Sequence, residues 1–384
     1  MAVVNGFMPQ GRSGHIVELQ SLRGIAATSV MVGHVLVYYK TPDWFLPFAV
    51  IFNGRAAVVI FFVLSGYVLT LSLRTALFDR ESVLRFYVQR LFRIYPAVWA
   101  ASSLSLFYIF TLHWQIPVAG ADIRTFRADR FDTLHIVASL AGMTTFILPQ
   151  LWTIFVELVA SAAIPGIAFI VQYRRGWYPY LLGASLLVSF TIPNTYYHVT
   201  MYFLDFVVGA GLTFPGFATK AVGNVRPYWP VPIRPILSFC LIGLALTLFL
   251  PLPYYSPAAH LLETILAATT ILLLIGAKER AELPGYDFAP LRLLNLRALL
   301  LLGDISYSLY LLHYPVLCIT AKVFAVLQKA VGIDVDVITL SILLAVATCA
   351  TTIPLAWLCY TYVERPGIKL GKLSLTQMKW ASAR

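Results

Sequence analysis

Charge is scarce in this sequence. Of its 384 residues only 12% are Asp, Glu, Lys or Arg, whereas 59% are hydrophobic, and the mean hydropathy is +0.79. No polar stretch is long enough for a separate soluble domain, so the composition excludes a water-soluble globular protein. Apolar runs of roughly 18 residues or more, which is the length that crosses a bilayer, recur along the chain. We therefore predict an all-α integral membrane protein that forms a single domain over residues 1–384.

Cysteine and recognisable cofactor motifs are also sparse. The four cysteines lie in apolar segments without a CxxC pair, which is typical of packing residues rather than of disulfides or metal ligands. There is no metal-ligand spacing, no GxSxG elbow and no Gly-rich phosphate loop before a helix, so no bound metal is predicted. The net charge of +11 does not indicate a nucleic-acid partner, because membrane proteins concentrate Lys and Arg in their cytoplasmic loops.

The apolar runs predict about ten transmembrane helices with both termini in the cytoplasm. With this topology, and leaving aside Arg23 and Arg55 in or at helices, 20 Lys and Arg residues lie inside and 6 outside. Residues 1–20 and 364–384 are then short cytoplasmic tails, and the first helix is an uncleaved anchor because no signal-peptide core precedes it. The predicted helices span residues 22–40, 56–73, 94–113, 151–173, 178–192, 198–214, 235–251, 259–277, 299–320 and 337–362.

Residues 133–148 are an eleventh apolar segment. If they crossed the bilayer, every later loop would change sides, which would leave about 8 Lys and Arg residues inside and about 18 outside. We therefore predict an interfacial or re-entrant segment on the outer side. No internal repeat is visible, which weighs against the common inverted-repeat transporters.

The first helix carries two ionisable residues, Arg23 and His34, in the stretch SLRGIAATSVMVGHVLVYY (residues 21–39). They are eleven residues apart, so they share one helix face and lie ~16 Å apart along the axis. Arg23 falls at the cytoplasmic edge, where it is either a topology anchor or a ligand-binding group. His34 falls near mid-depth, where it either forms an interhelical hydrogen bond or acts as a general base.

Two further polar patterns flank these residues. In RFYVQRLFRIYP (residues 85–96), Arg90 and Arg93 form an i,i+3 pair at the inner edge, which suits a phosphate-bearing ligand or an ordinary positive-inside cluster. In LWTIFVELVAS (residues 151–161), Thr153, Glu157 and Ser161 form a polar stripe. A carboxylate at the depth of Glu157 must pair with a cation or be protonated, either in a functional site or as an interhelical lock.

The ninth predicted helix contains GDISYSLYLLHYPV (residues 303–316), in which Ser306, Tyr310 and His313 share one face. Tyr and His at such positions are either interfacial anchors or members of a site. In FFVLSGYVL (residues 61–69) we favour close helix packing at Ser65 and Gly66.

Several of these residues share a depth. His34, Glu157, Tyr310 and Ser65 come out near the middle of the membrane, while Arg23, Arg90 and Arg93 come out at its cytoplasmic face. The pattern predicts a polar cavity whose inner mouth is basic.

Two further buried acids, Asp205 and Glu263, are each a candidate partner for Arg55 or for a histidine. The sequence does not decide between these pairings.

Together the motifs resemble those of the acyltransferase-3 family of multi-pass bacterial membrane proteins. The resemblance covers nearly the whole chain. It rests, in order, on LRGIAATSVMVGH, FFVLSGYVL, RLFRIYP, LWTIFVE, ISYSLYLLHYP and VERP. It implies transfer of an acyl group, usually acetyl, from cytoplasmic acyl-CoA to a carbohydrate hydroxyl.

The resemblance also assigns motifs. The family's Arg-x10-His pair matches Arg23 and His34, its paired basic motif matches Arg90 and Arg93, and its Trp-containing motif ending in Glu matches Trp152 and Glu157. Its Ser-Tyr motif matches Ser306 and Tyr307. Some members carry an additional periplasmic esterase-like domain, which this sequence lacks. The chain is therefore expected to act alone, possible homodimers included, or to pass the acyl group to a separate periplasmic transferase, and it looks most like compact members that acetylate nodulation factors or exopolysaccharides.

On this basis the sequence predicts an inner-membrane O-acyltransferase. Acetyl-CoA is expected to bind through Arg90, Arg93 and Arg23. His34, oriented or charge-balanced by Glu157, acts as general base or as acyl carrier, and Tyr310 or Ser306 donates to the thioester oxyanion. The acceptor is a glycan or glycolipid in the bilayer. The competing hypothesis is a secondary transporter or a flippase for a lipid-linked sugar, which also requires polar residues at mid-depth.

Overall fold

Helices are the only regular elements of the computed structural model over the residues it describes, which are 16–39, 42–45, 47–48, 51–73, 79–112, 132–214, 233–281, 289–332 and 335–382. Each of the ten predicted helices corresponds to helical structure. The first six are α1 (Val17–Leu36), α3 (Gly54–Ser72), α4 (Arg80–Phe107), α6 (Leu151–Tyr173), α7 (Tyr178–Thr191) and α8 (Val199–Gly211). The remaining ones are α10 (Ile233–Leu246), α11 (Pro257–Ala281), α13 with α14 (Arg297–Asp304 and Ser306–Val331), and α15 (Val337–Cys359).

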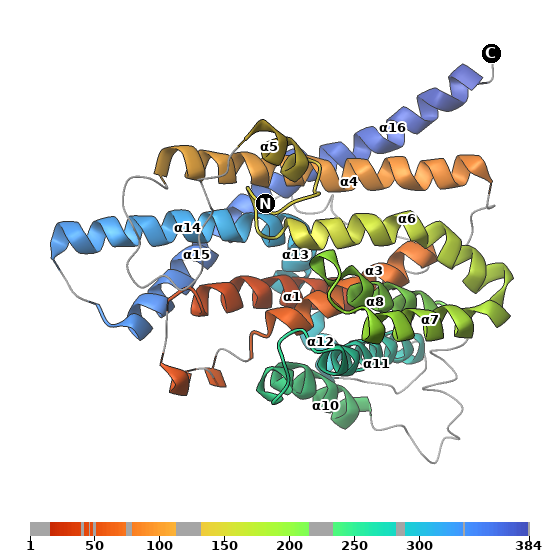
Figure 1. The fold of residues 1–384 in the computed structure, drawn as a ribbon, viewed down its shortest axis with the longest axis horizontal. Coiled ribbons are helices and arrows are strands. Elements are labelled where there is room, and N and C mark those ends of the chain that lie inside the picture. Colours follow the sequence, from red (N-terminus) through yellow and green to blue (C-terminus); the bar gives the residue numbers. More distant parts are fainter. Residues whose placement is uncertain are drawn as a thin grey trace.

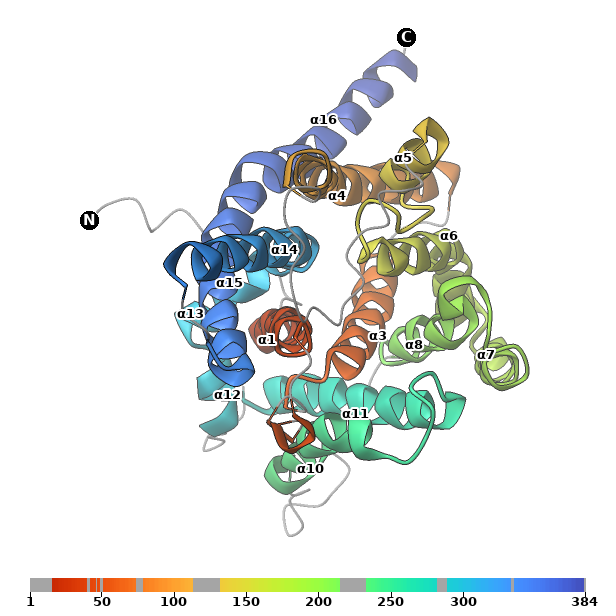
Figure 2. The same cartoon turned by 60° about the vertical axis from the view of Figure 1, so that its left-hand side comes forward.

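The long helix α4 runs along the long axis of the molecule, beside α14 over one half and beside α6 over the other (Figure 1). In the turned view α1 lies at the centre of a ring of helices, with α14 and α15 on one side, α3 on the other side and α11 below (Figure 2). α1 packs against α3, α13, α14 and α15. The helix that carries Arg23 and His34 is therefore the core of the bundle, because its neighbours shield it from lipid on most sides.

Six helical stretches among the described residues are long and apolar enough to cross a bilayer. They are Gly54–Ser72, Arg80–Leu112, Leu151–Tyr173, Pro257–Ala277, Ser306–Val331 and Val337–Leu373. At 14 and 13 residues, α7 and α8 are each ~20 Å long, which is shorter than a hydrocarbon core of ~30 Å. The two helices pack against each other as a hairpin. The total of ten spans and the cytoplasmic location of both termini remain predictions.

Residues 133–148 do not form a spanning helix. α5 (Thr133–Leu140) has only 8 residues, and residues 141–150 follow it without regular helix. Its length of ~12 Å is less than half of the hydrocarbon core. The prediction that this segment does not span is therefore confirmed, whereas its place on the outer side remains a prediction.

Three helix boundaries differ from those expected. The third helix begins at Arg80 rather than at residue 94, because Asp79 caps it by accepting a hydrogen bond from the Ser82 N–H, so Arg90 and Arg93 lie on a helix and not in a loop. The segment 299–320 is broken at Ile305 into α13 and α14. The last helix continues through a π-helical turn, Tyr360–Glu364, into α16 (Arg365–Ser382), so the expected tail is helical through Ser382.

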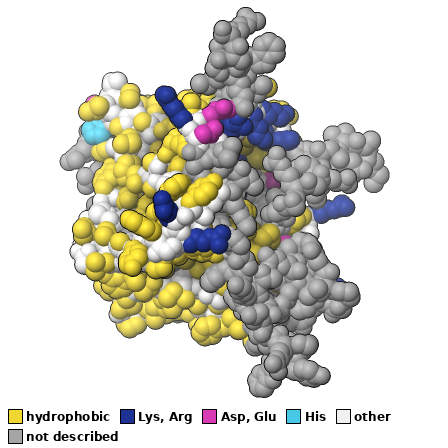
Figure 3. All heavy atoms as spheres, turned by 90° about the vertical axis from the view of Figure 1, so that its right-hand side faces the viewer, with side chains coloured by type: hydrophobic (Ala, Val, Ile, Leu, Met, Phe, Trp, Pro, Cys, Tyr) yellow, Lys and Arg dark blue, Asp and Glu magenta, His cyan; other side chains and the backbone are white. Residues whose placement is uncertain are grey.

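Figure 3 looks onto the end of the bundle where α3 ends and α4 begins. Several Lys and Arg side chains lie among hydrophobic ones on this face. α16 projects from the same half of the molecule (Figure 1).

Two helix crossings in this bundle depend on glycine. A Cβ on Gly24 of α1 would lie 2.6 Å from the Gly303 backbone N, and one on Gly303 of α13 would lie 2.2 Å from the Gln20 backbone O. A Cβ on Gly66 of α3 would lie 2.3 Å from the backbone O of Phe206 in α8. This confirms the prediction that Gly66 permits close packing. The first crossing also decides the site, because it brings Arg23 next to the start of α14.

Candidate active site

Two cavities meet at Arg23. The mouth cavity, of about 260 Å³, is lined by residues that include Gln20, Arg23, Arg93 and Asp304. The inner cavity, of about 60 Å³, is lined by Arg23, Val58, Phe61, Phe62, Ser65, Thr153, Ile154, Glu157, Ser306, Tyr307 and Tyr310. Arg23 belongs to both walls, so its guanidinium lies at the junction between them. A polar cavity with a basic mouth was predicted from the sequence, and these two cavities contain five of the seven predicted site residues.

The remaining predicted arginine, Arg90, forms an ion pair inside the bundle. Its guanidinium contacts the carboxylate of Glu157, and its Nε donates to Ser161 Oγ at 3.1 Å. The second arginine, Arg93, lies 3.3 Å from Glu364, whose other oxygen accepts from Ser308 Oγ at 2.8 Å. Both pairs join α4 to other helices. Both guanidinium groups therefore have carboxylate partners in this structure, and their contact with donor phosphates stays a prediction.

Arg23 differs from these two arginines. Among the described residues it makes no hydrogen bond or ion pair, although the charges of Arg90, Arg93, Glu157 and Glu364 all act on it. An unpaired guanidinium within a membrane protein is costly unless a partner or water reaches it. Arg23 is therefore the cation in this cluster that is available to bind an anionic ligand.

His34 contacts a second histidine and not Glu157. Its Nδ1 lies 3.0 Å from Nε2 of His313, and the two rings are stacked with their centroids 5.1 Å apart. His313 is fully buried on α14, where its Nδ1 lies 2.6 Å from the backbone O of Tyr310. The amide Nε2 of Gln150 lies 3.3 Å from His313 Nε2. The hypothesis that Glu157 orients His34 is therefore corrected, because the carboxylate is bound by Arg90 and the imidazole is held by His313.

These contacts assign a tautomer to each ring. The Tyr310 carbonyl only accepts, so the proton of a neutral His313 is on Nδ1 and its Nε2 is an acceptor. His34 then donates from Nδ1 to that acceptor, which leaves the lone pair of His34 Nε2 available. An imidazole with a free lone pair and a fixed ring is what a general base requires.

Tyr310 and Ser306 lie on α14 at different heights of the inner cavity. Tyr310 lies one turn before His313 on α14. Its ring packs edge-to-face against Phe61, with the ring centroids 6.1 Å apart, and its hydroxyl is hydrogen-bonded to Thr153. Ser306, one turn further toward the mouth, is fully buried, and its Oγ has no hydrogen-bond partner. The neighbouring Tyr307 is anchored by donating to the backbone O of Ile94 at 3.1 Å. Tyr310 is therefore closer than Ser306 to the histidine pair along α14.

Sequence reasoning assigned no role to Glu364 and Gln150, and it named His313 as a candidate without its partner. Glu364 was visible only as part of VERP, and its position depends on the π-helical turn at the end of α15. His313 shares a face with Tyr310, but its pairing with His34 requires two helices to meet. Gln150 precedes α6 in a segment with no helical periodicity, so no pattern in the sequence indicates its role.

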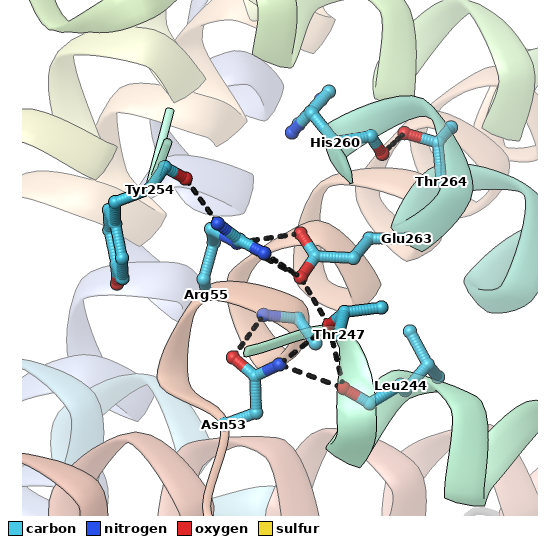
Figure 4. A network of polar contacts seen from close by, with 9 residues as sticks. Asn53, Arg55, Leu244, Thr247, Tyr254, His260, Glu263 and Thr264 are labelled. Atoms are coloured by element: carbon cyan, nitrogen blue, oxygen red, sulfur yellow. Dashed lines mark hydrogen bonds and ion pairs between the residues drawn. The ribbon is translucent and has the colours of Figure 1, made fainter. Parts of the chain in front are cut away.

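A second polar network lies at the start of α3, around Asn53 and Arg55. Arg55 Nε donates to both oxygens of Glu263, at 2.9 and 3.1 Å, and its NH1 donates to the backbone O of Tyr254 (Figure 4). Thr247 donates to Glu263 at 2.6 Å, and Asn53 donates to Thr247 at 2.9 Å. Of the two candidate partners that the sequence offered for Arg55, Glu263 is the one that binds it.

The other buried acid of this network, Asp205, pairs with a histidine. His260 Nε2 lies 3.2 Å from Asp205 Oδ1, which also accepts from Thr264 at 2.6 Å. We call the two groups together the Arg55–Glu263 network.

No group of three or more His, Cys, Asp or Glu that could hold a metal ion occurs within the described part of the chain. The four cysteines are free thiols.

Comparison with known proteins identifies the family of this chain. Residues 16–361 match the model of the acyltransferase-3 family, which is described as an acyltransferase domain. The chain belongs to the acyltransferase-3 family. The exopolysaccharide production protein ExoZ of Rhizobium meliloti (strain 1021) is 27% identical over 83% of this chain and 91% of its own length. All the motifs that carried the resemblance therefore lie in a domain shared with the acyltransferase-3 proteins or, for the terminal VERP, directly after it.

A second relative extends the comparison. The peptidoglycan O-acetyltransferase OatA of Listeria monocytogenes is 23% identical over 91% of this chain, and the chain spans 56% of OatA's length. No solved structure is significantly similar to the chain. The acyltransferase-3 chain described here is thus a multi-helix membrane protein with relatives in polysaccharide modification.

Proposed function

We propose that this acyltransferase-3 protein transfers an acetyl group from cytoplasmic acetyl-CoA to a hydroxyl group of a glycan or glycolipid. The observation that carries the proposal is the His34–His313 pair, which joins α1 to α14. Both helices also contribute to the wall of the inner cavity, α1 through Arg23 and α14 through Ser306, Tyr307 and Tyr310, although the two histidines themselves do not line it. A donor that enters at the mouth cavity brings its phosphates to Arg23 and extends its thioester toward His34. The names of ExoZ and OatA support a polysaccharide acceptor, and the apolar helices support the bacterial inner membrane as the location.

The reaction then balances within the site. His34 Nε2 removes the proton of the acceptor hydroxyl while the oxygen attacks the thioester carbonyl. The hydroxyl of Tyr310 donates to the carbonyl oxygen as negative charge develops on it. The C–S bond breaks, and the coenzyme A thiolate takes up the proton from His34. In the alternative route, His34 Nε2 itself attacks the thioester and carries the acetyl group to the acceptor.

Glu157 has a different role in this proposal from the one expected. It holds Arg90 against α6 and shapes the cavity wall next to Arg23. Arg93 and Glu364 do the same at the mouth. We propose that these pairs position Arg23 and the mouth, and that Arg23 makes the direct contact with donor phosphates.

The test is acetyl transfer from radiolabelled acetyl-CoA in membranes that contain the wild-type protein or His34→Ala at equal expression. We expect the variant to lose at least ~100-fold of the activity, which is the contribution typical of a general base. Full activity of His34→Ala would overturn the mechanism. A wild-type protein that neither labels an acceptor nor hydrolyses acetyl-CoA, but moves a lipid-linked sugar, would instead indicate a transporter or flippase.

A further inference from the structure

The break between α13 and α14 leaves a helix N-terminus inside the protein. Helical hydrogen bonding stops at Ile305, and α14 starts again at Ser306 and runs for 26 residues. Ile305, Ser306 and Ser308 are all fully buried. The first N–H groups of a helix have no partner within it, and Ile305 offers no side-chain cap. A buried helix start without a cap is unfavourable unless another group accepts those hydrogen bonds.

The side chains in the first turn of α14 differ in whether they have a hydrogen-bond partner. Tyr307 donates to the backbone O of Ile94, and Ser308 donates to Glu364. Ser306 is the exception, because its buried Oγ has no hydrogen-bond partner among the residues that the structure describes, and it lines the inner cavity. A buried hydroxyl without a partner costs about 1–3 kcal/mol, so its presence in the cavity wall points to a ligand atom that accepts from it.

Charge in the cavity favours an anion as this ligand. Arg23 lines the same cavity and has no partner among the described residues. Glu157 also lines it, but Arg90 balances its charge. Asp304 lies two residues before α14, lines the mouth cavity instead and accepts from Gln20 at 2.7 Å. The inner-cavity side of the helix start therefore combines a cation, a free donor and the positive end of the helix dipole.

We propose that the N-terminus of α14, Ser306 Oγ and Arg23 together form a binding site for a phosphoryl anion. Helix N-termini bind phosphate through their free N–H groups and dipole, and broken helices in membrane proteins direct such ends at anionic groups. The inference rests on the proposed function for the source of the anion, which is the diphosphate end of the acyl donor. Arg23 and His34 lie ~16 Å apart along α1, a span of the order of an extended pantetheine arm.

In this proposal Ser306 binds the phosphoryl group and takes no part in acyl transfer. Ser306 lies one turn further from His313 than Tyr310 does, so Tyr310 is the better placed donor to the thioester oxygen. Ser306 then acts as a phosphate-binding residue, in place of the oxyanion role that the sequence suggested.

Binding to purified full-length protein in nanodiscs of neutral lipid tests the site without an activity assay. The probes are inorganic pyrophosphate and coenzyme A, titrated calorimetrically at constant ionic strength. We expect Ser306→Ala to weaken both about tenfold or more, since a hydrogen bond to a charged group is lost. Arg23→Gln is expected to abolish pyrophosphate binding. The matched control is Ser102→Ala, which removes another fully buried, unpartnered hydroxyl on α4 that does not line either cavity.

Ser306→Asp distinguishes a ligand site from a structural cap. An acidic residue in the first turn stabilises a helix, so the variant should fold at least as well as wild type in thermal unfolding. The same carboxylate repels an anion, and we expect pyrophosphate binding to disappear. Wild-type pyrophosphate binding by both Ser306→Asp and Ser306→Ala would overturn the proposal.

Three further outcomes separate the possible failures. Pyrophosphate and coenzyme A binding that depends on Ser306, in a protein without acyl transfer, would leave the site standing and overturn the proposed function. Acyl transfer with donor binding that is unaffected by Ser306 substitutions would overturn the site and leave the proposed function standing. Displacement of pyrophosphate by phosphatidylglycerol in the nanodisc, but not by coenzyme A, would identify a lipid headgroup as the occupant and overturn the assignment to the donor.

Discussion

Two clusters of charged residues lie beside α3, one at its first turn around Arg55 and the other around Arg23, and they differ in how completely their charges are paired. In the Arg55–Glu263 network, Arg55 is 7% exposed and Glu263 is fully buried, and the guanidinium contacts both carboxylate oxygens and a backbone carbonyl. In the cluster around Arg23, two arginines are paired but the third is not, and two cavities open onto it.

Buried charge by itself therefore does not identify a functional site. Both clusters contain the same residue types at membrane depth, where ionisable residues are candidates for function. The Arg55–Glu263 network joins α3 to α11 and α10 and has no cavity of those described beside it, which is what a structural lock requires. The Arg23 cluster keeps a free cation and space for a ligand, which is what binding requires. The following predictions test this distinction.

Removing one partner of the Arg55–Glu263 network should have the largest effect. Glu263→Ala leaves a buried, unpaired guanidinium, and we expect the free energy of unfolding to fall by about 3–5 kcal/mol. Thermal or denaturant unfolding of the purified protein measures this. The double variant Arg55→Met with Glu263→Leu should recover most of the loss. A Glu263→Ala protein that is stable but cannot bind donor would mean that this network belongs to a site.

Removing His313, the hydrogen-bond partner of His34, should reduce kcat by about 100-fold, near the lower end of the range for a general base. His313→Leu deletes the acceptor that fixes the His34 ring, so kcat should fall while the KM for acetyl-CoA changes little. His313→Gln offers a side-chain carbonyl as acceptor and should restore part of the kcat. Equal loss of kcat in both variants would mean that His313 only fills space.

Widening the crossing of α3 and α8 should lower the free energy of unfolding by about 1–3 kcal/mol. A Cβ at Gly66 would meet backbone atoms of Phe206 at 2.3 to 2.8 Å, so Gly66→Ala must push α3 away from α8. Thermal unfolding measures the loss. Val68→Ala, an exposed position on the same helix, is the control with little expected change.

The smallest effect is expected at the mouth. Arg93→Ala should raise the KM for acetyl-CoA about tenfold and leave the KM for the acceptor unchanged, because only the donor passes this cavity. Steady-state kinetics with each substrate varied in turn measures both. Equal increases for donor and acceptor would show that Arg93 acts as a topology anchor.

The sequence by itself determined the helices and the family. Apolar runs placed all ten predicted helices because burial in lipid or in a helix bundle demands continuous apolar segments. The eleven-residue spacing of Arg23 and His34 put both on one face of α1, since helical geometry is local. The failure of residues 133–148 to span also followed from the charge distribution.

Only the tertiary structure decided which charged groups are partners. Arg90 with Glu157, Arg93 with Glu364 and His34 with His313 are each contributed by two helices far apart in the sequence, and no spacing rule connects them. The break at Ile305 was equally invisible, because Leu301, Ile305 and Leu309 keep helical spacing across LLGDISYSL. Close packing at Gly24 and Gly303 brings that break next to Arg23. Long-range packing therefore determined which cation stays free.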